Sequence, residues 1–162
     1  MDTGERIPRA LGTRRVLVGE GTGREAQLRA AWVAWLRTFR WDYFATGTWT
    51  HPVSAPTARA VVQRWLAACA SRDPHVRPSR WRDPYAAVGV QRGSVGKHHV
   101  HLLIGGLGRH PATAAQLRGA WIKGGHVQVA GYAPQRGAIE YMVRQADDLE
   151  LLGTPVPYRP RR

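Results

Sequence analysis

Two histidines near the middle of the chain have the spacing of a metal-binding pair. His99 and His101 lie in an apolar stretch that spans residues 99–105 and has the composition of a β-strand. Because successive side chains of a strand point to opposite faces of a sheet, the two imidazoles project from the same face. Imidazole is a common ligand of divalent metals. The pair therefore predicts a metal site on one face of a sheet.

A tyrosine about forty residues downstream is the candidate nucleophile. Tyr141 lies within the sequence AIEYMVRQ, residues 138–145, in a helix predicted to run from Pro134 to about Leu149. At about 100° per residue, the apolar side chains gather on one face of this helix, and Tyr141 and Arg144 lie on the other. The position of Tyr141 away from the apolar stripe favours a functional role for its hydroxyl over a structural role in the core. Arg144 follows by about one turn and can reach the same phosphate.

The elements that must position these residues alternate between strands and helices. Helices are expected at residues 24–40, 56–69, 111–121 and 134–149, and strands at residues 43–50, 85–91, 98–105 and 127–130. Ser54 is the expected N-cap of the second helix. This order predicts an α+β fold, with a mostly antiparallel central sheet that carries the His-x-His pair on a central strand and helices packed on it.

The 162 residues have the length of one domain. We expect residues 1–22 to form a basic, flexible N-terminal arm, because they are rich in glycine and arginine without a sustained period. Residues 23–150 are expected to form the folded domain. Residues 151–162 are expected to form a Pro/Arg-rich tail.

The charge balance indicates a polyanionic partner. Lysine and arginine number 24 against 11 acidic residues, for a net charge of +13, which favours nucleic acid. A membrane is less favoured, since no apolar run approaches the length of a spanning helix. Cys69 is the one cysteine, so an internal disulfide or a thiolate zinc site cannot form, which fits a reducing compartment.

Several basic, aromatic and hydroxyl side chains are candidates for contact with nucleic acid. Arginine binds phosphate through two parallel hydrogen bonds, and Trp81 can stack on an unpaired base. Thr46 and Thr48 are either β-formers on a polar face or DNA contacts. The candidate set is Arg77, Arg80, Trp81, Arg82, Arg92, Lys97, Thr46 and Thr48.

Three motifs in order resemble those of the HUH endonucleases, the replication initiators of rolling-circle plasmids and viruses. Residues 44–48, with the sequence FATGT, are similar to the early strand motif of that family. Residues 99–101 match its two-histidine signature. Tyr141 matches its helical tyrosine, and Arg144 stands where the family has lysine. Because a guanidinium stays charged, Arg144 is a poor general acid.

The resemblance implies an RRM/ferredoxin-like HUH fold and the replication-initiator (Rep) type of enzyme with a single catalytic tyrosine. Such an enzyme nicks and rejoins a specific single-stranded DNA through a covalent 5′-phosphotyrosine, with Mn²⁺ or Mg²⁺ as cofactor. The implied partners are single-stranded DNA at an origin hairpin, and a host helicase and polymerase, since the chain has no phosphate-binding Gly-Lys-Ser/Thr loop. The implied setting is the cytoplasm of a prokaryotic cell, with the gene on a plasmid, phage or other mobile element.

The resemblance leaves the third metal ligand open. Gln91 would lie on the strand beside His99, near where initiators of this family carry a glutamate. Gln145, one turn after Tyr141, stands where related single-tyrosine transposases carry a glutamine ligand. We place Gln91 first. Either choice gives a neutral site, which binds Mg²⁺ more weakly than a site with a carboxylate.

Two other functions fit the same residues. One is a single-tyrosine HUH transposase, favoured if Gln145 is the ligand. The other, from a different class, is a non-catalytic RRM-like module that binds nucleic acid through stacking aromatics on its central strands. A His-x-His pair by itself is often only a hydrogen-bonded surface pair. It is the combination with Tyr141 and the basic charge that favours the enzyme.

Overall fold

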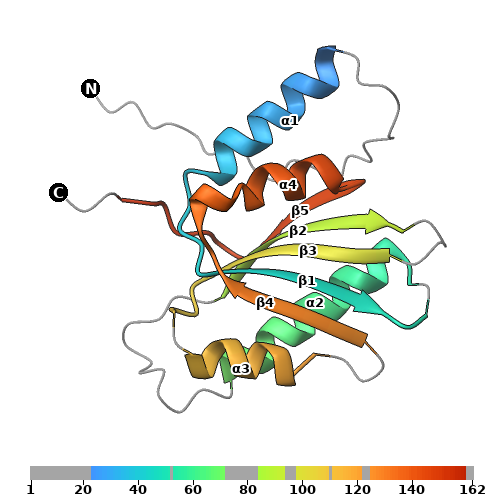
Figure 1. Cartoon of the computed structure of the whole chain (residues 1–162), viewed down its shortest axis with the longest axis vertical. Coiled ribbons are helices and arrows are strands. Elements are labelled where there is room, and N and C mark those ends of the chain that lie inside the picture. Colours follow the sequence, from blue (N-terminus) through green and yellow to red (C-terminus); the bar gives the residue numbers. More distant parts are fainter. Residues whose placement is uncertain are drawn as a thin grey trace.

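The computed structural model describes residues 23–51, 53–71, 84–93, 98–109, 111–121 and 125–159. Its helices are α1 (Gly23–Leu36), α2 (Ala55–Ser71), α3 (Pro111–Gly119) and α4 (Ala138–Gln145), with a short 3₁₀ helix, η1 (Pro134–Arg136), before α4. Its strands are β1 (Tyr43–Trp49), β2 (Tyr85–Arg92), β3 (His98–Gly105), β4 (Gly125–Gly131) and β5 (Asp148–Leu152). Figure 1 shows these strands as one open sheet with helices on both of its faces.

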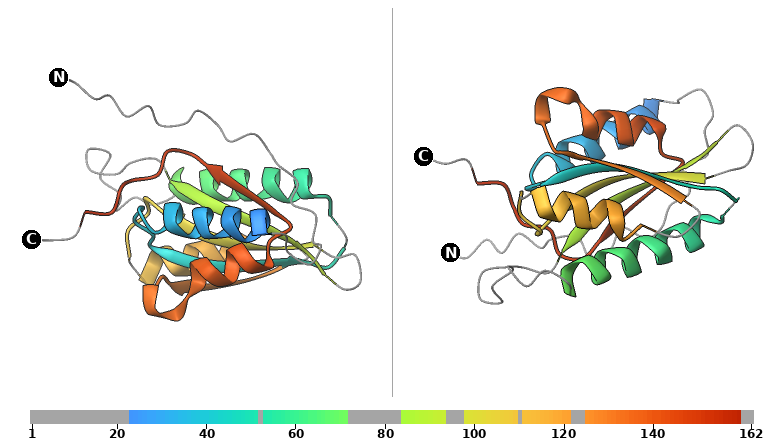
Figure 2. Two further views of the ribbon diagram at one scale, coloured as in Figure 1. Left: turned by 90° about the horizontal axis from the view of Figure 1, so that it is seen from above. Right: turned by 60° about the horizontal axis from the view of Figure 1, so that its bottom comes forward.

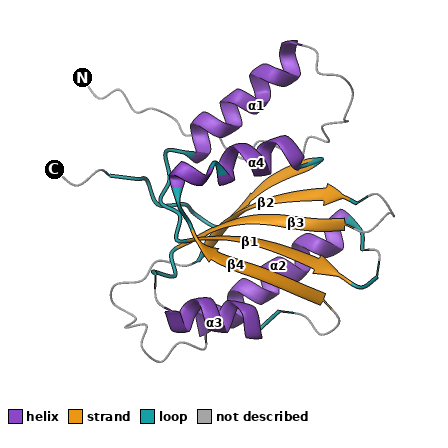
Figure 3. Cartoon of the chain, viewed as in Figure 1, coloured by secondary structure: helices purple, strands orange, loops and turns teal. Residues whose placement is uncertain are grey.

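The sheet is antiparallel between all neighbouring strands that the structure describes. Its strand order is β4-β1-β3-β2-β5, so β3, which carries His99 and His101, lies at the centre (Figure 3). The arrangement is a ferredoxin/RRM-like α+β fold. It confirms the predicted fold class and the predicted place of the His-x-His pair on a central strand.

The face of the sheet that α2 and α3 cover, here called the α2 face, holds an apolar core. On β3 the residues that point to it are Val100, Leu102 and Ile104, all fully buried. Ser54 caps α2 as predicted, because its Oγ accepts a hydrogen bond from the Thr57 backbone N–H at 3.2 Å. Figure 2 shows α2 and α3 together on this side of the sheet, opposite α1 and α4.

The opposite face, here called the α4 face, is only partly covered. Helix α4 packs over β2 and β3, and α1 packs against α4. On β4, by contrast, the residues that point to this face, His126, Gln128 and Ala130, are exposed. His99 and His101 of β3 point to the α4 face, at the border between its covered and open halves.

The start of α4 depends on Gly137. This residue has a left-handed backbone (φ 64°, ψ 30°) and links the end of η1 to the first residue of α4. Glycine adopts this conformation without the steric cost that a side chain would bring. The turn at Gly137 thus sets the direction in which α4 crosses the sheet.

The predicted helix over residues 134–149 is wrong at its carboxyl end, since α4 ends at Gln145 and β5 begins at Asp148. The sequence of β5 alternates acidic and apolar residues, which is the two-residue period of a strand. Leu149 and Leu151 pack on the α4 face. Asp148 and Glu150 point to the α2 face and pair with Arg59 of α2 at 2.6 and 3.0 Å.

The composition of the chain predicts that its two ends lie outside the folded domain. Strand β5 extends to Leu152, two residues past the predicted end of the folded domain, and Pro157 forms a β-bridge with Phe39. The predicted N-terminal arm, residues 1–22, lies outside the described residues. Within the described parts of the chain, no helix is long and apolar enough to span a membrane.

Candidate functional site

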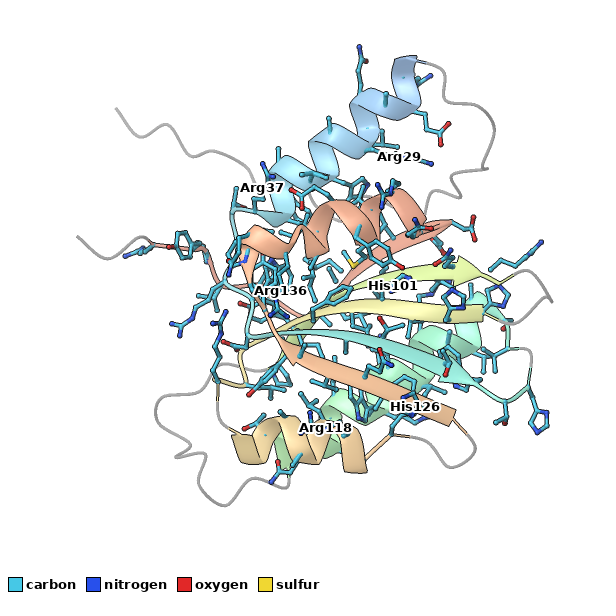
Figure 4. The ribbon with its side chains drawn as sticks, in the orientation of Figure 1. Arg29, Arg37, His101, Arg118, His126 and Arg136 are labelled. Atoms are coloured by element: carbon cyan, nitrogen blue, oxygen red, sulfur yellow. The ribbon has the colours of Figure 1, made fainter. Side chains whose placement is uncertain are left out.

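The two histidines of the signature differ in their surroundings although both lie on β3. His101 pairs with Thr46 of β1 and Gly89 of β2 across the sheet, and only 2% of its surface is exposed. His99 lies nearer the strand end, opposite Gln91, and is half-buried. Figure 4 shows His101 between the sheet and α4. One imidazole is therefore shielded from water and the other is accessible.

Gln91 joins the two imidazoles. Its Oε1 lies 3.1 Å from His99 Nε2 and 2.9 Å from His101 Nε2. An amide oxygen has two lone pairs, so it can accept from each Nε2 that carries a proton, and when both nitrogens are unprotonated the three atoms can share a metal ion. The three side chains thus bring two nitrogens and one oxygen to a common point on the α4 face.

Thr46 holds the far side of the His101 ring. Its Oγ1 lies 3.2 Å from His101 Nδ1. A hydroxyl can donate or accept, so it serves either tautomer of the imidazole. When Nδ1–H donates to Thr46, the Nε2 lone pair of His101 is free to bind a metal, as is common for metal-ligating histidines.

His101 is suited to stay neutral. Burial, and to a lesser extent the neighbouring His99 imidazole, lowers the pKa of His101 from 6.5 to about 4. At neutral pH a proton therefore does not compete with a metal for this nitrogen. A histidine must be unprotonated at the nitrogen that binds a metal, and the lowered pKa of His101 favours that state.

The donor set fits a divalent ion. Ligands at about 2.0–2.1 Å from an octahedral ion such as Mg²⁺ lie about 3.0 Å from their neighbours in the coordination shell. The two spacings from Gln91 Oε1 to the imidazole nitrogens, 3.1 and 2.9 Å, have this size. Within the described ranges, no three histidine, cysteine, aspartate or glutamate side chains form a potential metal site. His99, His101 and the Gln91 amide oxygen are the groups that could hold such an ion at this point of the sheet.

Tyr141 lies beside the histidines. Ile139, Met142 and Val143 of α4 are buried, whereas Tyr141 is 40% exposed, as the helical periodicity predicts. The centroid of its ring is 5.0 Å from that of His101, with the planes at 78°. The fold thus places an accessible phenol next to the imidazole pair.

Arg144 accompanies Tyr141 on the exposed side of α4. Its guanidinium carbon lies 5.9 Å from the centroid of the Tyr141 ring, within the range of a cation–π contact. Arg144 is exposed. A phosphate at Tyr141 would therefore meet a permanent positive charge at the edge of the site.

The two candidate third ligands are bonded to each other. Gln91 Nε2 donates a hydrogen bond to Gln145 Oε1 at 3.1 Å. Gln91 is the one that faces both imidazoles, and Gln145 stands behind it, at the end of α4.

The predicted nucleic-acid contacts divide into those near the site and those that the structure leaves undescribed. Thr46 contacts His101, and Thr48 Oγ1 donates to the backbone oxygen of His126 at 3.3 Å. Arg92 is exposed, at the end of the strand that carries Gln91. The remaining candidates, Arg77, Arg80, Trp81, Arg82 and Lys97, lie outside the described residues.

Phe44 is a site residue that the sequence-based prediction did not single out. Its ring lies parallel to that of His101, at a centroid distance of 6.2 Å and 5° between planes, and it meets Tyr141 edge-on at 6.5 Å. Strand parity was a usable signal, since Phe44 shares a face with Thr46. Its contact with Tyr141 depends on the packing of α4, which the sequence pattern does not define.

Comparisons with known proteins assign no family. No family model matches the chain, and no curated protein matches it. Among solved structures, the chain is similar to the hypothetical protein ORF119 from Sulfolobus islandicus rod-shaped virus 1, with a TM-score of 0.43 and 9% sequence identity. The similarity covers 72% of this chain and 91% of that one. A likeness of this size supports no functional assignment.

Proposed function

We propose that this protein nicks and rejoins single-stranded DNA in a metal-dependent reaction with Tyr141 as the nucleophile, as in the initiation of rolling-circle replication. One observation carries the proposal. An accessible tyrosine packs against His101, whose Nε2 faces the same amide oxygen of Gln91 as His99 does. The accompanying charge of +13 fits a polyanionic substrate.

The reaction would transfer a phosphoryl group from DNA to the tyrosine. Tyr141 loses its hydroxyl proton to water and attacks the phosphorus, so that an Oη–P bond forms and the bond from phosphorus to the 3′ oxygen breaks. The 3′ oxygen takes a proton from water. The products are a 5′-phosphotyrosine and a free 3′-hydroxyl, and the reverse reaction rejoins the strand.

His99, His101 and Gln91 would hold Mn²⁺ or Mg²⁺. When bound, the ion polarises a non-bridging phosphate oxygen and offsets the charge that grows in the transition state. The chain's own part is to keep the His101 imidazole neutral through burial, to orient it through Thr46, and to turn the Gln91 amide oxygen toward both imidazoles. Arg144 supplies a fixed positive charge beside Tyr141, and its role is to orient the phosphate rather than to donate a proton.

The partly open α4 face is the reason to favour a single strand. Tyr141 lies where α4 borders the open half of the sheet, and His126, Gln128 and Ala130 are exposed there. An unpaired strand can lie on such a surface with its bases toward the sheet. Unwinding of the duplex would then fall to a host helicase, and we expect the natural target to be an origin hairpin.

Covalent trapping tests the proposal. The full chain is mixed with end-labelled, randomised single-stranded DNA and Mn²⁺, and the products are separated on a denaturing gel. We expect a protein–DNA adduct that is absent with Tyr141→Phe and absent in chelator. Tyr158→Phe is the matched control, because Tyr158 is also exposed but lies outside the site. It should form the adduct as the unaltered protein does.

Two results would overturn the proposal. One is an adduct that survives Tyr141→Phe, or that peptide mapping assigns to another residue. The other is the absence of any adduct from a pool that the protein demonstrably binds and that is deep enough to contain the site.

The open half of the α4 face also supports a second candidate, a non-catalytic nucleic-acid-binding module of the RRM-like type. The exposed residues of β4 and the hydroxyls of Thr46 and Thr48 could contact bases without any metal. Binding by such a module should survive chelation and the loss of Tyr141, and no adduct should form. The trapping experiment therefore separates the two functions.

A further inference from the structure

We propose that Gln145 is a positioning residue, which fixes the end of the Gln91 amide that faces His99 and His101. This inference rests on the metal-binding part of the proposed function. In this role Gln145 itself does not contact the ion, although related transposases carry a ligand at the equivalent helical position. The basis is a connected set of hydrogen-bonding contacts that begins on α4 and ends at the imidazoles.

The contact between the two glutamines determines whether the oxygen or the NH₂ group of Gln91 faces the imidazoles. A primary amide has one accepting end and one donating end. The donating end of Gln91 is engaged by Gln145 Oε1 at 3.1 Å. Its accepting end therefore faces His99 Nε2 and His101 Nε2, at 3.1 and 2.9 Å.

The reverse orientation of Gln91 would disable the site. Its NH₂ group would then face the two Nε2 atoms and donate to the same lone pairs that a metal needs. No oxygen would remain to complete the donor set. Because Gln91 and Gln145 are bonded, Gln91 cannot turn unless Gln145 turns with it or the bond is lost. The bond therefore holds the metal-binding orientation.

The same bond connects the metal site to the nucleophile. Gln145 is the last residue of α4 and follows Tyr141 by four positions, so the two lie on one side of the helix. Gln91 lies on β2 beside His99. A change at Gln145 should thus affect the orientation of a metal ligand on the sheet although the altered residue lies on the helix.

Mn²⁺ titration of the full chain, without DNA, tests the inference. The titration compares Gln145→Leu and Gln145→Met with the unaltered protein and with Gln128→Leu. Gln128 is an exposed amide on the same face, on β4, which two strands separate from β2. We expect both Gln145 variants to weaken Mn²⁺ binding about tenfold, and Gln128→Leu to leave it unchanged. Circular dichroism checks that each variant is folded.

A second background separates positioning from direct ligation. In Gln91→Glu both ends of the side chain are oxygens, so the ion meets an oxygen in either orientation. Gln145→Leu should then change Mn²⁺ affinity less than about twofold. An equal loss in both backgrounds would overturn the inference and make Gln145 a ligand.

Two further outcomes would also overturn it. If Gln145→Leu leaves Mn²⁺ affinity unchanged in both backgrounds, Gln145 has no positioning role, although the metal site itself remains supported. No Mn²⁺ binding by the unaltered protein removes the metal basis of both the inference and the proposed function. Because no DNA is present, these results are independent of the trapping experiment.

Discussion

The two faces of the sheet are built from the same strands but differ in chemistry. On β3, Val100, Leu102 and Ile104 point to the α2 face and are fully buried in an apolar core. His99 and His101 alternate with them and point to the α4 face, beside Gln91 and Tyr141. The α2 face is closed by helices, whereas the β4 side of the α4 face is open.

This difference shows that one strand can contribute core residues on one face and functional residues on the other. Because side chains alternate across a strand, the site residues are held by a backbone whose other face is fully packed. The two faces should therefore respond differently to substitution. Changes on the α2 face should lower the free energy of unfolding, and changes on the α4 face should alter metal binding and cleavage.

The largest effect on stability is expected from Leu102→Ala. Leu102 is fully buried on the α2 face, next to His101, and its truncation leaves a cavity that should cost about 2–5 kcal/mol of unfolding free energy. Denaturant titration measures this loss. His99→Ala, three residues earlier and half-buried, should cost less than about 1 kcal/mol while abolishing the adduct. Equal losses from the two substitutions would contradict the division between faces.

A pair of glycines offers a sharper comparison. In Gly47→Ala the new methyl group would overlap the Trp121 ring on the α2 face, and in Gly89→Ala it would lie 2.9 Å from Met142 Cγ of α4. Both changes overpack the structure and should cost about 1–3 kcal/mol. Only Gly89→Ala should lower the adduct yield of folded protein, because it displaces the helix that carries Tyr141. Equal yields from the two variants would count against this account.

The α4 face should also make stability depend on pH. The pKa of His101 is about 4 in the folded protein, against 6.5 when unfolded, so between these values the unfolded chain binds more protons. Stability should therefore fall as pH drops from 6.5 toward 4, by about 1–3 kcal/mol from this residue. Denaturant titrations of the unaltered protein and of His101→Gln, in chelator and over this pH range, isolate the contribution of His101 to the free energy of unfolding. Parallel pH profiles for the two proteins would show that the proposed His101 contribution is absent.

The smallest effect is expected from Thr46→Val. The substitution keeps the shape of the side chain but removes the hydroxyl that lies 3.2 Å from His101 Nδ1. The imidazole loses its orienting partner, so Mn²⁺ binding should weaken about tenfold, with little change in the free energy of unfolding. Isothermal titration calorimetry measures the affinity, and Thr48→Val is the matched control on the same strand. An effect at Thr48 as large as that at Thr46 would argue against a specific contact with His101.

Much of the fold was predictable because local patterns were strong. The apolar alternation of β1, β2 and β3 and the helical stripe of α4 agree with the packing in the structure. Strand β5 was missed because its alternation is only five residues long, follows closely on the helical pattern of α4, and carries the acidic residues Asp148 and Glu150. Their partner, Arg59, lies far away in the sequence, so the ion pairs that favour the strand exist only once α2 has packed on the sheet.

The candidate site was predictable to the level of residue types and faces. The alternation of side chains along a strand predicted that His99 and His101 share one face of the sheet. The helical periodicity predicted that Tyr141 lies on the polar side of α4. The choice between Gln91 and Gln145 was not predictable to the same degree. Both glutamines lie near the histidines. Only the side-chain geometry shows that Gln91 faces the imidazoles and that Gln145 faces Gln91.

By itself the sequence determined the α+β class, the central strand with its two histidines and the exposed position of Tyr141. These features follow from periods of two and 3.6 residues, which are local properties of the chain. The tertiary structure alone decided that β5 adds an edge strand, that Phe44 contacts Tyr141, and that Gln145 stands behind Gln91. Each of these depends on contacts between segments far apart in the chain, which form only when the helices pack against the sheet.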